Sequence, residues 1–538
     1  MISFIINKLR YLKLLNANYV EEQRKQRAFQ SKKSENSLQK LSQSLKQNLE
    51  AIKNQIGNNY DVIIREFCLA DQIEVALIYL SGMTDHITIN ENIIKPLMLY
   101  SGLPHYNKPF EITQIKSSIL SVGEVKQYRS FDEIIEGCLS GNSILLVNGC
   151  DEALSIVTAD WKSRGIEEPK TESVVRGPRQ GFNESLVANT TLIRRIIKSP
   201  DLKVEAMKLG KKTNTNVCIA YLHGVANPLL IEEIKRRINR IKTDSILESG
   251  YVEQFIEDAP FSIFSTIANS EKPDSTAAKI LEGRAAILVD GTPFALTVPM
   301  VFIESFQSSE DYYSRPYFAS LIRIIRFLAF FLSIIAPASY VALTTFHQEL
   351  IPTPLLFSMA SAQEGVPFPA VMEASMMGVI FEILREAGVR LPRPVGQAVS
   401  IVGALVIGES AVTAGLIGAP MVIVVALTAV ASFVVPAQTD SGGIMRIIFV
   451  ILAGFMGIYG IVIGLLGLFI HLASLRSFGT PYLSPIAPLS ISDLKDSVIR
   501  VPLWSMLTRP RTIGWQDPER QEFRLKPSPP SEEIKEAE

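Results

Sequence analysis

Apolar residues are spread unevenly along this chain, and long uncharged runs occur only in its C-terminal half. Residues 327–346 form a run of 20 without a charge, and residues 395–436 form a run of 42 in which Glu409 is the only charge. A third run, 447–473, has 27 residues with His471 as its only titratable group. A helix needs about 20 apolar residues to cross a bilayer. The pattern therefore predicts an all-α membrane bundle of four to five helical segments.

The expected membrane segments are five in number, and basic residues beside them predict their orientation. They are 327–346, 366–384, 396–414, 419–436 and 447–473. Arginines precede the first segment and follow the last, so the positive-inside rule places both ends in the cytosol. Both ends inside require an even number of crossings, so one of the five does not cross alone.

Two arrangements satisfy this even number of crossings. In one, 366–384 is an interfacial, re-entrant or cavity-lining helix, because Glu373 and Glu382 interrupt it. In the other, that stretch crosses fully, since Arg385 favours a cytosolic end, and 396–436 is an incompletely spanning hairpin. The sequence leaves both open.

The polar region before residue 311 alternates between strand-like and helix-like runs, which predicts two α/β subdomains in the cytosol. Strands are expected at 62–69, 74–80, 143–148, 154–158, 203–208, 216–221, 285–289 and 295–298. Helices are expected at 89–100, 131–139, 186–197, 228–241 and 276–281. Between two of the strands, Asp290-Gly291-Thr292-Pro293 is typical of a hairpin turn.

The pattern divides the chain into five parts. They are a basic polar N-terminal arm (1–60), α/β subdomain 1 (61–165), α/β subdomain 2 (166–310), a transmembrane helical domain (311–475) and a cytosolic tail (476–538). The tail contains repeated prolines, and we expect disorder near its acidic end. Leucines at helical spacing in the arm predict either an amphipathic helix on a partner or anionic lipid, or a solvated arm.

Composition excludes several classes of protein. The net charge of -1 gives no reason to expect nucleic-acid binding, and the four cysteines have no CxxC spacing, so we expect reduced thiols and no metal site. Lys8, Arg10 and Lys13 interrupt the apolar start of the chain, unlike a signal peptide. No catalytic constellation or nucleotide-binding motif is present, so we expect no enzyme activity and no cofactor.

Glu409 is the main candidate for an ion path or pore, together with Glu373 and Ser410. A carboxylate at the centre of a membrane span costs about 2.5–3.5 kcal/mol, so such residues usually face a bundle interior or water. Glu409 either lines a pore or is a protonated, hydrogen-bonded packing residue, and the sequence does not decide between them.

The segment 172–184 contains the most distinctive motif of the polar region. Its residues Arg176, Gly177, Pro178, Arg179 and Gly181 combine two arginines with two glycines. One interpretation is an assembly or gating motif whose arginines bind an anion or carboxylate through bidentate contacts. The other is an interdomain turn whose arginines pair with nearby glutamates.

Four stretches of this sequence resemble the A subunit of the GerA-family spore germinant receptors. They are ESVVRGPRQGFNESLVANTTLIRRIIKSPDLKVE, SIVGALVIGES, APMVIVVALTAVASFVVP and TPYLSPIAPLSISDLKDSVIRVPLW. The resemblance extends from about residue 60 to about residue 515, and leaves both ends of the chain uncovered.

The resemblance implies a protein of the inner membrane of bacterial endospores. It implies a complex with a permease-like B subunit and a lipoprotein C subunit, and self-association into a pentamer. The complex would sense a nutrient and release ions, with the A subunit as the channel. From the residues alone, a secondary transporter or a non-conducting scaffold stays open as an alternative. Transporters usually show internal repeats and more spans.

Overall fold

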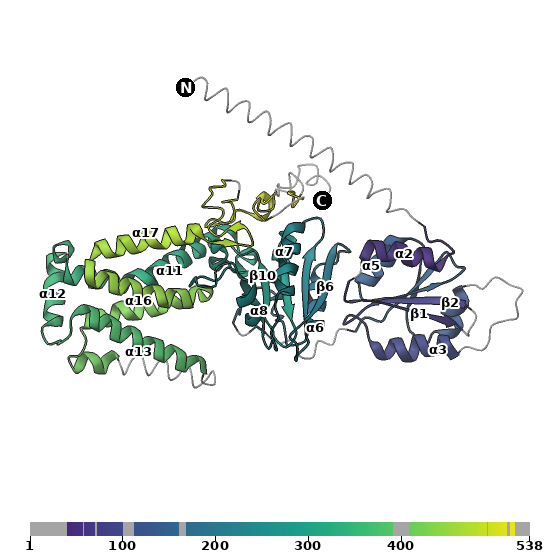
Figure 1. Cartoon of the computed structure of the whole chain (residues 1–538), viewed down its shortest axis with the longest axis horizontal. Helices are drawn as coiled ribbons and strands as arrows, with labels where there is room; N and C mark the ends of the chain where they lie inside the picture. The colour runs from purple at the N-terminus through teal and green to yellow at the C-terminus, as the bar shows by residue number, and fades with distance from the viewer. Residues whose placement is uncertain are drawn as a thin grey trace, which may run out of the picture.

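This computed structural model describes residues 40–57, 59–69, 73–99, 112–160, 168–169, 171–390, 408–491, 493–513 and 517–521. Three parts follow one another along the long axis of the molecule (Figure 1). They are a first α/β unit, a second α/β unit and a bundle of helices. The expected fold class, α/β followed by an all-α bundle, is therefore confirmed.

The first α/β unit is an antiparallel sheet with helices on both faces. In the order β1-β2-β4-β5-β3, its strands are β1 (Val62–Leu69), β2 (Ile73–Leu80), β4 (Ser143–Val147), β5 (Ala153–Ile156) and β3 (Val125–Tyr128). Alternate residues of a strand face opposite sides. Ile78 therefore packs with α2 (Leu45–Ile56) and α5 (Phe131–Leu139), whereas Leu77 packs with the shorter segments η1 (Thr88–Ile94), α3 (Lys95–Leu99), α4 (Ile112–Gln114) and η2 (Ile115–Ile119).

The second α/β unit has the same architecture. In the order β6-β7-β9-β10-β8, its strands are β6 (Leu202–Leu209), β7 (Thr215–Leu222), β9 (Ala285–Val289), β10 (Ala295–Val298) and β8 (Ala268–Ser270). The helices α7 (Pro228–Asn239) and α8 (Ser249–Ile256) cover one face. The helices α6 (Leu186–Ile196) and α9 (Pro273–Leu281) cover the other.

The two units are copies of one fold. The elements α5, β4 and β5 correspond to α9, β9 and β10, and their first residues are shifted by 142 throughout: 131 against 273, 143 against 285 and 153 against 295. Asn48 and Asn189 each exchange hydrogen bonds of 2.9 and 2.6 Å with the backbone six residues earlier. Gly149 and Gly291 occupy corresponding hairpin turns of the two units, with φ of 88° and 91°. Sequence analysis had predicted two units of similar style but not this correspondence.

A buried ion pair joins the two units. Arg194 of α6 donates from Nε and Nη2 to both carboxylate oxygens of Asp61, at 2.8 and 2.9 Å. Both side chains are buried, and Arg194 also donates to the carbonyl of Leu202 at 2.9 Å. Removing one partner of a buried pair costs about 3–5 kcal/mol. The pair therefore fixes the first unit on the second.

Most predicted elements of the polar region are confirmed, several to the residue, as for α5 and β9. The short edge strands β3 and β8 and the helix α8 were not predicted. The leucines Leu45 and Leu49 of the expected arm lie in α2 and are covered by the first unit's own sheet. Residues 1–39 lie outside the described residues.

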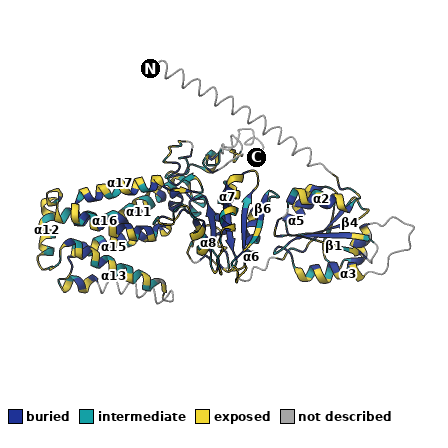
Figure 2. Cartoon of the chain, in the orientation of Figure 1, coloured by how far each residue is buried: buried dark blue, intermediate teal, exposed yellow. Residues whose placement is uncertain are grey.

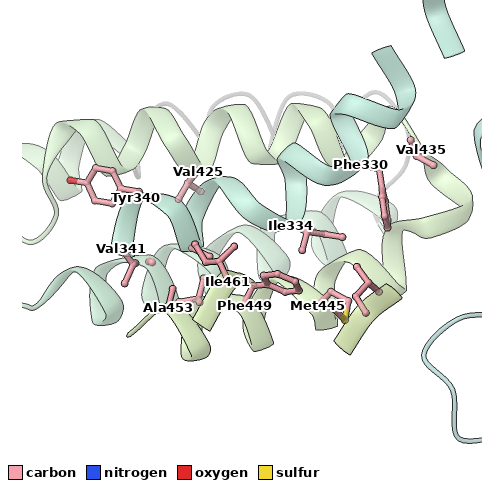
Figure 3. Packing of buried hydrophobic residues seen from close by; sticks show 14 of the residues in the cluster. Phe330, Ile334, Tyr340, Val341, Val425, Val435, Met445, Phe449, Ala453 and Ile461 are labelled. Atoms are coloured by element: carbon pink, nitrogen blue, oxygen red, sulfur yellow. The ribbon is translucent and has the colours of Figure 1, made fainter. Parts of the chain in front are cut away.

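The helical bundle contains two helices that are long and apolar enough to cross a membrane, Pro316–Thr345 and Pro436–Met456. The bundle consists of α11 (Pro316–Thr345), α12 (Thr353–Gln363), α13 (Ala370–Arg390), α15 (Ala419–Phe433), α16 (Thr439–Met456) and α17 (Ile458–Ser474), among the described residues. Phe330 and Ile334 of α11 pack against Met445 and Phe449 of α16 in its core (Figure 3). Apolar side chains also cover its outer side, which is exposed in Figure 2.

The predicted single span 447–473 is wrong, because the chain breaks at Gly457. Gly457 has φ of 61°. The helix α16 ends just before it and α17 begins just after it, and the two helices pack against each other. A Cβ at this position would also lie 2.7 Å from the ring of His347. Hydropathy did not reveal this turn, because a glycine can reverse the chain without polar residues beside it.

The Glu-bearing stretch 366–384 corresponds to α13, which packs along α11, α15 and α16. Of the predicted span 396–414, residues 396–407 lie outside the described residues. The number of crossings therefore stays a prediction.

Candidate functional site

The base of α11 meets the C-terminal tail in a cluster of buried and half-buried polar side chains, which we call the junction (Asp311, Tyr312, Arg323, Arg326, Asp496 and Arg500). Arg323 is fully buried and donates from Nε to Asp311 Oδ2 at 2.9 Å. Its Nη1 donates to Asp496 Oδ1 at 2.8 Å and to the carbonyl of Ser497 at 3.1 Å. One side chain thus binds α11 to both the preceding segment and the tail.

Arg326 and Tyr312 add hydrogen bonds to the two carboxylates of the junction. Arg326 Nη1 donates to both oxygens of Asp311 at 2.8 and 2.9 Å. Tyr312 lies in the short helix α10 (Glu310–Tyr313) and donates to Asp496 Oδ2 at 2.8 Å. Burial, and then the charge of Asp496, raises the pKa of Tyr312 well above its usual value. The phenol therefore stays protonated as a donor.

Arg500 anchors the tail from the opposite side. Its backbone N–H donates to Ser320 Oγ at 3.0 Å, and its Nη1 donates to the carbonyl of Ser314 at 3.1 Å. Buried charges are retained only when they are paired and hydrogen-bonded. The tail segment around Asp496 and Arg500 is therefore a structural part of the membrane junction.

A second group of charges connects the second α/β unit to the same region. Arg284, at the start of β9, forms an ion pair with Glu304 in the 3-10 helix η3 (Phe302–Phe306) and donates to the carbonyl of Pro299 at 3.0 Å. Burial raises the pKa of Glu304, but Arg284 and Lys279 outweigh it and hold that pKa below its usual value. The junction is thereby rigidly connected to the sheet of the second unit.

The predicted motif 176–181 lies beside this junction. Gly177 has φ of 138°, and a Cβ there would lie 2.7 Å from the ring of Tyr313, the residue next to Tyr312. Tyr313 in turn donates to Asp274 Oδ2 at 2.7 Å. Pro178 is exposed and Gly181 is buried. The glycine therefore has a close-packing role that sequence analysis did not specify.

The two arginines of the motif point away from this packing. Arg176 and Arg179 are exposed, and the nearest carboxylate recorded for Arg179 is Glu168, at 4.0 Å. At that distance an exposed pair contributes little to stability. The expected pairing inside an interdomain turn is therefore weak, which leaves both guanidinium groups available to another chain.

We predict that Arg176→Ala or Arg179→Ala impairs assembly or gating while leaving the fold intact. Because both side chains are exposed, we expect the free energy of unfolding to change by no more than about 0.5 kcal/mol, which is less than for the substitution of a buried residue. Protein level, complex formation and germination response would be measured together. A changed nutrient preference with a normal maximal response would contradict the prediction.

Glu373, a predicted ion-path residue, is buried and caps a helix. Its Oε2 accepts from the backbone N–H of Gly418 at 2.9 Å, at the N-terminus of α15. A carboxylate there satisfies an otherwise unpaired N–H and interacts favourably with the helix dipole. Its geometry is that of a structural cap joining α13 to α15.

Glu409 and Ser410 are exposed, on the helical turn 408–413. The Glu409 carboxylate makes no recorded hydrogen bond to any described residue. The three predicted ion-path residues are therefore not brought together in one cluster: Glu373 is buried under α15, and the other two lie on the surface before it.

Sequence analysis missed a second polar contact of α13. Arg446 of α16 is buried, donates from Nε to the carbonyl of Ser333 at 3.1 Å and lies 3.4 Å from Glu382 Oε1. Glu382 is also paired with Arg385 at 2.7 Å. Sequence analysis used Glu382 and Arg385 only to judge whether 366–384 crosses, and the charge of Arg446 just before an uncharged run was the available signal.

The described residues contain no group of three or more His, Cys, Asp or Glu side chains placed to hold a metal ion. What the fold does provide is a mechanical connection. Duplicated α/β units are attached through buried ion pairs to one end of an apolar helical bundle. This arrangement defines a membrane protein with a large attached polar region.

Comparison with known proteins gives the family. The family described as Bacillus/Clostridium GerA spore germination protein matches residues 50–512, and the chain belongs to it. Spore germination protein KA of Bacillus subtilis (strain 168) is 49% identical over 91% of this chain and 90% of its own length. Spore germination protein GerLA of Bacillus cereus is 39% identical over 87% of this chain and 95% of its own.

Two further relatives are a membrane protein and a solved N-terminal domain. The uncharacterized membrane protein YfkQ of Bacillus subtilis (strain 168) is 42% identical over 88% of this chain and 92% of its own length. The crystal structure of the N-terminal domain of the A subunit of the Bacillus megaterium spore germinant receptor GerK3 is 37% identical, with a TM-score of 0.40. It covers 49% of this chain and 98% of that chain. The expected identification as a germinant receptor A subunit in a membrane is confirmed.

Proposed function

We propose that this chain is the ion-channel-forming subunit of a nutrient-sensing germinant receptor, which opens and releases cations at the start of germination. The observation that carries the proposal is the exposure of Glu409 on a bundle whose outer side is largely apolar. A charged side chain facing lipid is costly, so we place Glu409 toward water or another subunit. In a ring of identical chains each copy supplies one such carboxylate, and acidic rings favour cations.

The proposed assembly is a pentamer of this chain with a permease-like B subunit and a lipoprotein C subunit, in the inner membrane of the endospore. Both termini lie in the cytosol. In support, α11 begins and α17 ends at the same face of the bundle, next to the second α/β unit. Arg323 is bound to the tail there, and Ser477 Oγ donates to the carbonyl of Thr266 at 2.6 Å.

In the proposed mechanism, the second α/β unit transmits motion to the pore through the junction. Nutrient sensing by the complex shifts this unit, and the buried pairs of Arg284 and Arg323 carry the shift into α11. Because α13 is tied to both α15 and α16, a movement of α11 repacks the whole bundle. Packed helices change between discrete arrangements, which suits an opening transition.

We predict that Glu409→Gln lowers the rate of potassium release or the cation selectivity without changing protein level or assembly. Glutamine keeps the size and hydrogen bonding and removes the charge, so only an electrostatic role is lost. Glu409→Leu should act similarly if the residue faces a wet pore. Release of potassium and abundance of the subunit would be measured for both variants. Normal release from the glutamine variant would contradict the proposal and favour a transporter or a non-conducting scaffold.

A further inference from the structure

The second α/β unit exposes aromatic side chains along α8 and in the loop that follows it. Tyr251 is 43% exposed, Phe255 57% and Phe261 100%. Tyr251 and Phe255 are four residues apart and therefore lie on one side of the helix. Leu247, 62% exposed, precedes them with the same spacing. Aromatic side chains gathered in this way on a surface mark an interaction site.

The loop lies against the end of a bundle helix. Ser262 Oγ is 3.0 Å from His471 Nε2, and the ring of Phe264 lies 6.1 Å from that of His471. Phe264 is buried within the core of the bundle. Figure 1 places α8 on the side of the second unit that faces the bundle. The loop that carries Phe261 therefore lies beside the C-terminal end of α17.

The length of α17 gives the depth of this loop. Its 17 residues extend for about 25 Å, close to the thickness of the hydrocarbon core of about 30 Å. His471 lies within one turn of the end of α17 at Ser474, and its neighbours Phe469 and Ile470 are exposed on the apolar surface. The loop that contacts His471 thus lies at the boundary between hydrocarbon and headgroups.

The acidic side chains of this segment are engaged with the protein. Asp258 accepts from Arg237 Nη2 at 2.6 Å, and Glu253 accepts from Ser265 Oγ at 2.8 Å. Glu248 accepts from Thr292 Oγ1 at 3.0 Å. Glu257 is half-buried, and burial raises its pKa. Three of the four carboxylates of this segment therefore already have partners within the protein.

We propose that Tyr251, Phe255 and Phe261 bind the phospholipid interface of the leaflet next to the second α/β unit. Aromatic side chains are enriched at this depth because their rings are amphipathic enough to lie among headgroups. The contact supports the second unit beside the bundle, in addition to the junction. The inference rests on the proposed channel function and adds to it that α17 crosses the membrane.

The test is lipid quenching of tryptophan fluorescence in the full-length chain reconstituted in phosphatidylcholine vesicles. Three variants are compared with the parent chain, whose own tryptophans are subtracted: Phe261→Trp, Phe469→Trp and Ile87→Trp. The exposed Ile87 lies in the first α/β unit, far from the bundle, and Phe469 reports on α17 itself. Because Phe261 is fully exposed, tryptophan there leaves the fold unchanged.

We expect lipids brominated near the headgroup to reduce the fluorescence of Trp at 261 at least twofold, with less effect from lipids brominated near the chain end. Trp at 469 should be quenched as well, and Trp at 87 should not. Quenching at 469 without quenching at 261 would overturn the lipid contact alone and leave the aromatic surface for a protein partner. No quenching at 469 would overturn the crossing by α17, and the lipid contact with it.

Discussion

Replacing Arg323 with alanine is expected to release the C-terminal tail and to lower the free energy of unfolding by about 1–3 kcal/mol, because Asp496 and the carbonyl of Ser497 lose a charged donor. Asp311 keeps Arg326 as a partner at 2.8 Å, so the loss falls mainly on Asp496. The tail should then become accessible to trypsin at Lys495 and Arg500. Thermal unfolding of the full chain and the rate of this cleavage would be measured together.

Arg315→Ala is the matched control for this variant. Arg315 precedes the same helix and is exposed, with no recorded side-chain contact among the described residues. It should leave both the unfolding temperature and the cleavage rate unchanged. Equal effects of the two substitutions would show that the junction is not what holds the tail.

Local pattern predicted the elements of the polar region because each has its own start and stop signals. Ser130 caps α5 in a capping box, and the turn at Asp290 and Gly291 joins β9 to β10 as expected. The strand β8 has only three residues and could not produce a recognisable period. Edge strands of this kind form only where a neighbour is already in place.

Hydropathy predicted the bundle but not its turns. The break at Gly457 lies inside an uncharged run, and His347 from a distant segment approaches so closely there that a Cβ would lie 2.7 Å from its ring. Similarly, a glutamate within an apolar segment, such as Glu373, is typical of an ion path. Only its hydrogen bond from the backbone N–H of Gly418 identifies Glu373 as a helix cap. Long-range contacts decide the role of a membrane carboxylate, and residue type alone does not.

The junction could not be predicted because its members are far apart in sequence. Arg323 and Asp496 are separated by 173 residues, and sequence analysis used Arg323 and Arg500 only as indicators of orientation. The resemblance to the family included this part of the tail. It did not show that the tail pairs with α11.

Glu382→Gln is expected to lower the free energy of unfolding more than Arg446→Gln does, because Glu382 is the only negative charge in its cluster with Arg385 and Arg446. Glu382 lies between Arg446 at 3.4 Å and Arg385 at 2.7 Å. Its neutralisation leaves two arginines together, one of them buried, and should lower the free energy of unfolding by about 1–3 kcal/mol. Arg446→Gln leaves Glu382 paired with Arg385, and the glutamine can still donate to the carbonyl of Ser333.

The double variant decides whether these charges are coupled as the structure indicates. Removing Arg446 relieves the repulsion created by Glu382→Gln, so the double variant should be more stable than Glu382→Gln alone and close to Arg446→Gln. Charges in direct contact typically show coupling of about 0.5–3 kcal/mol. Arg390→Ala, at the exposed end of the same helix, is the control and should be silent. Additive losses in denaturant unfolding of the full chain would mean that Arg446 holds α11 and α16 together without binding α13.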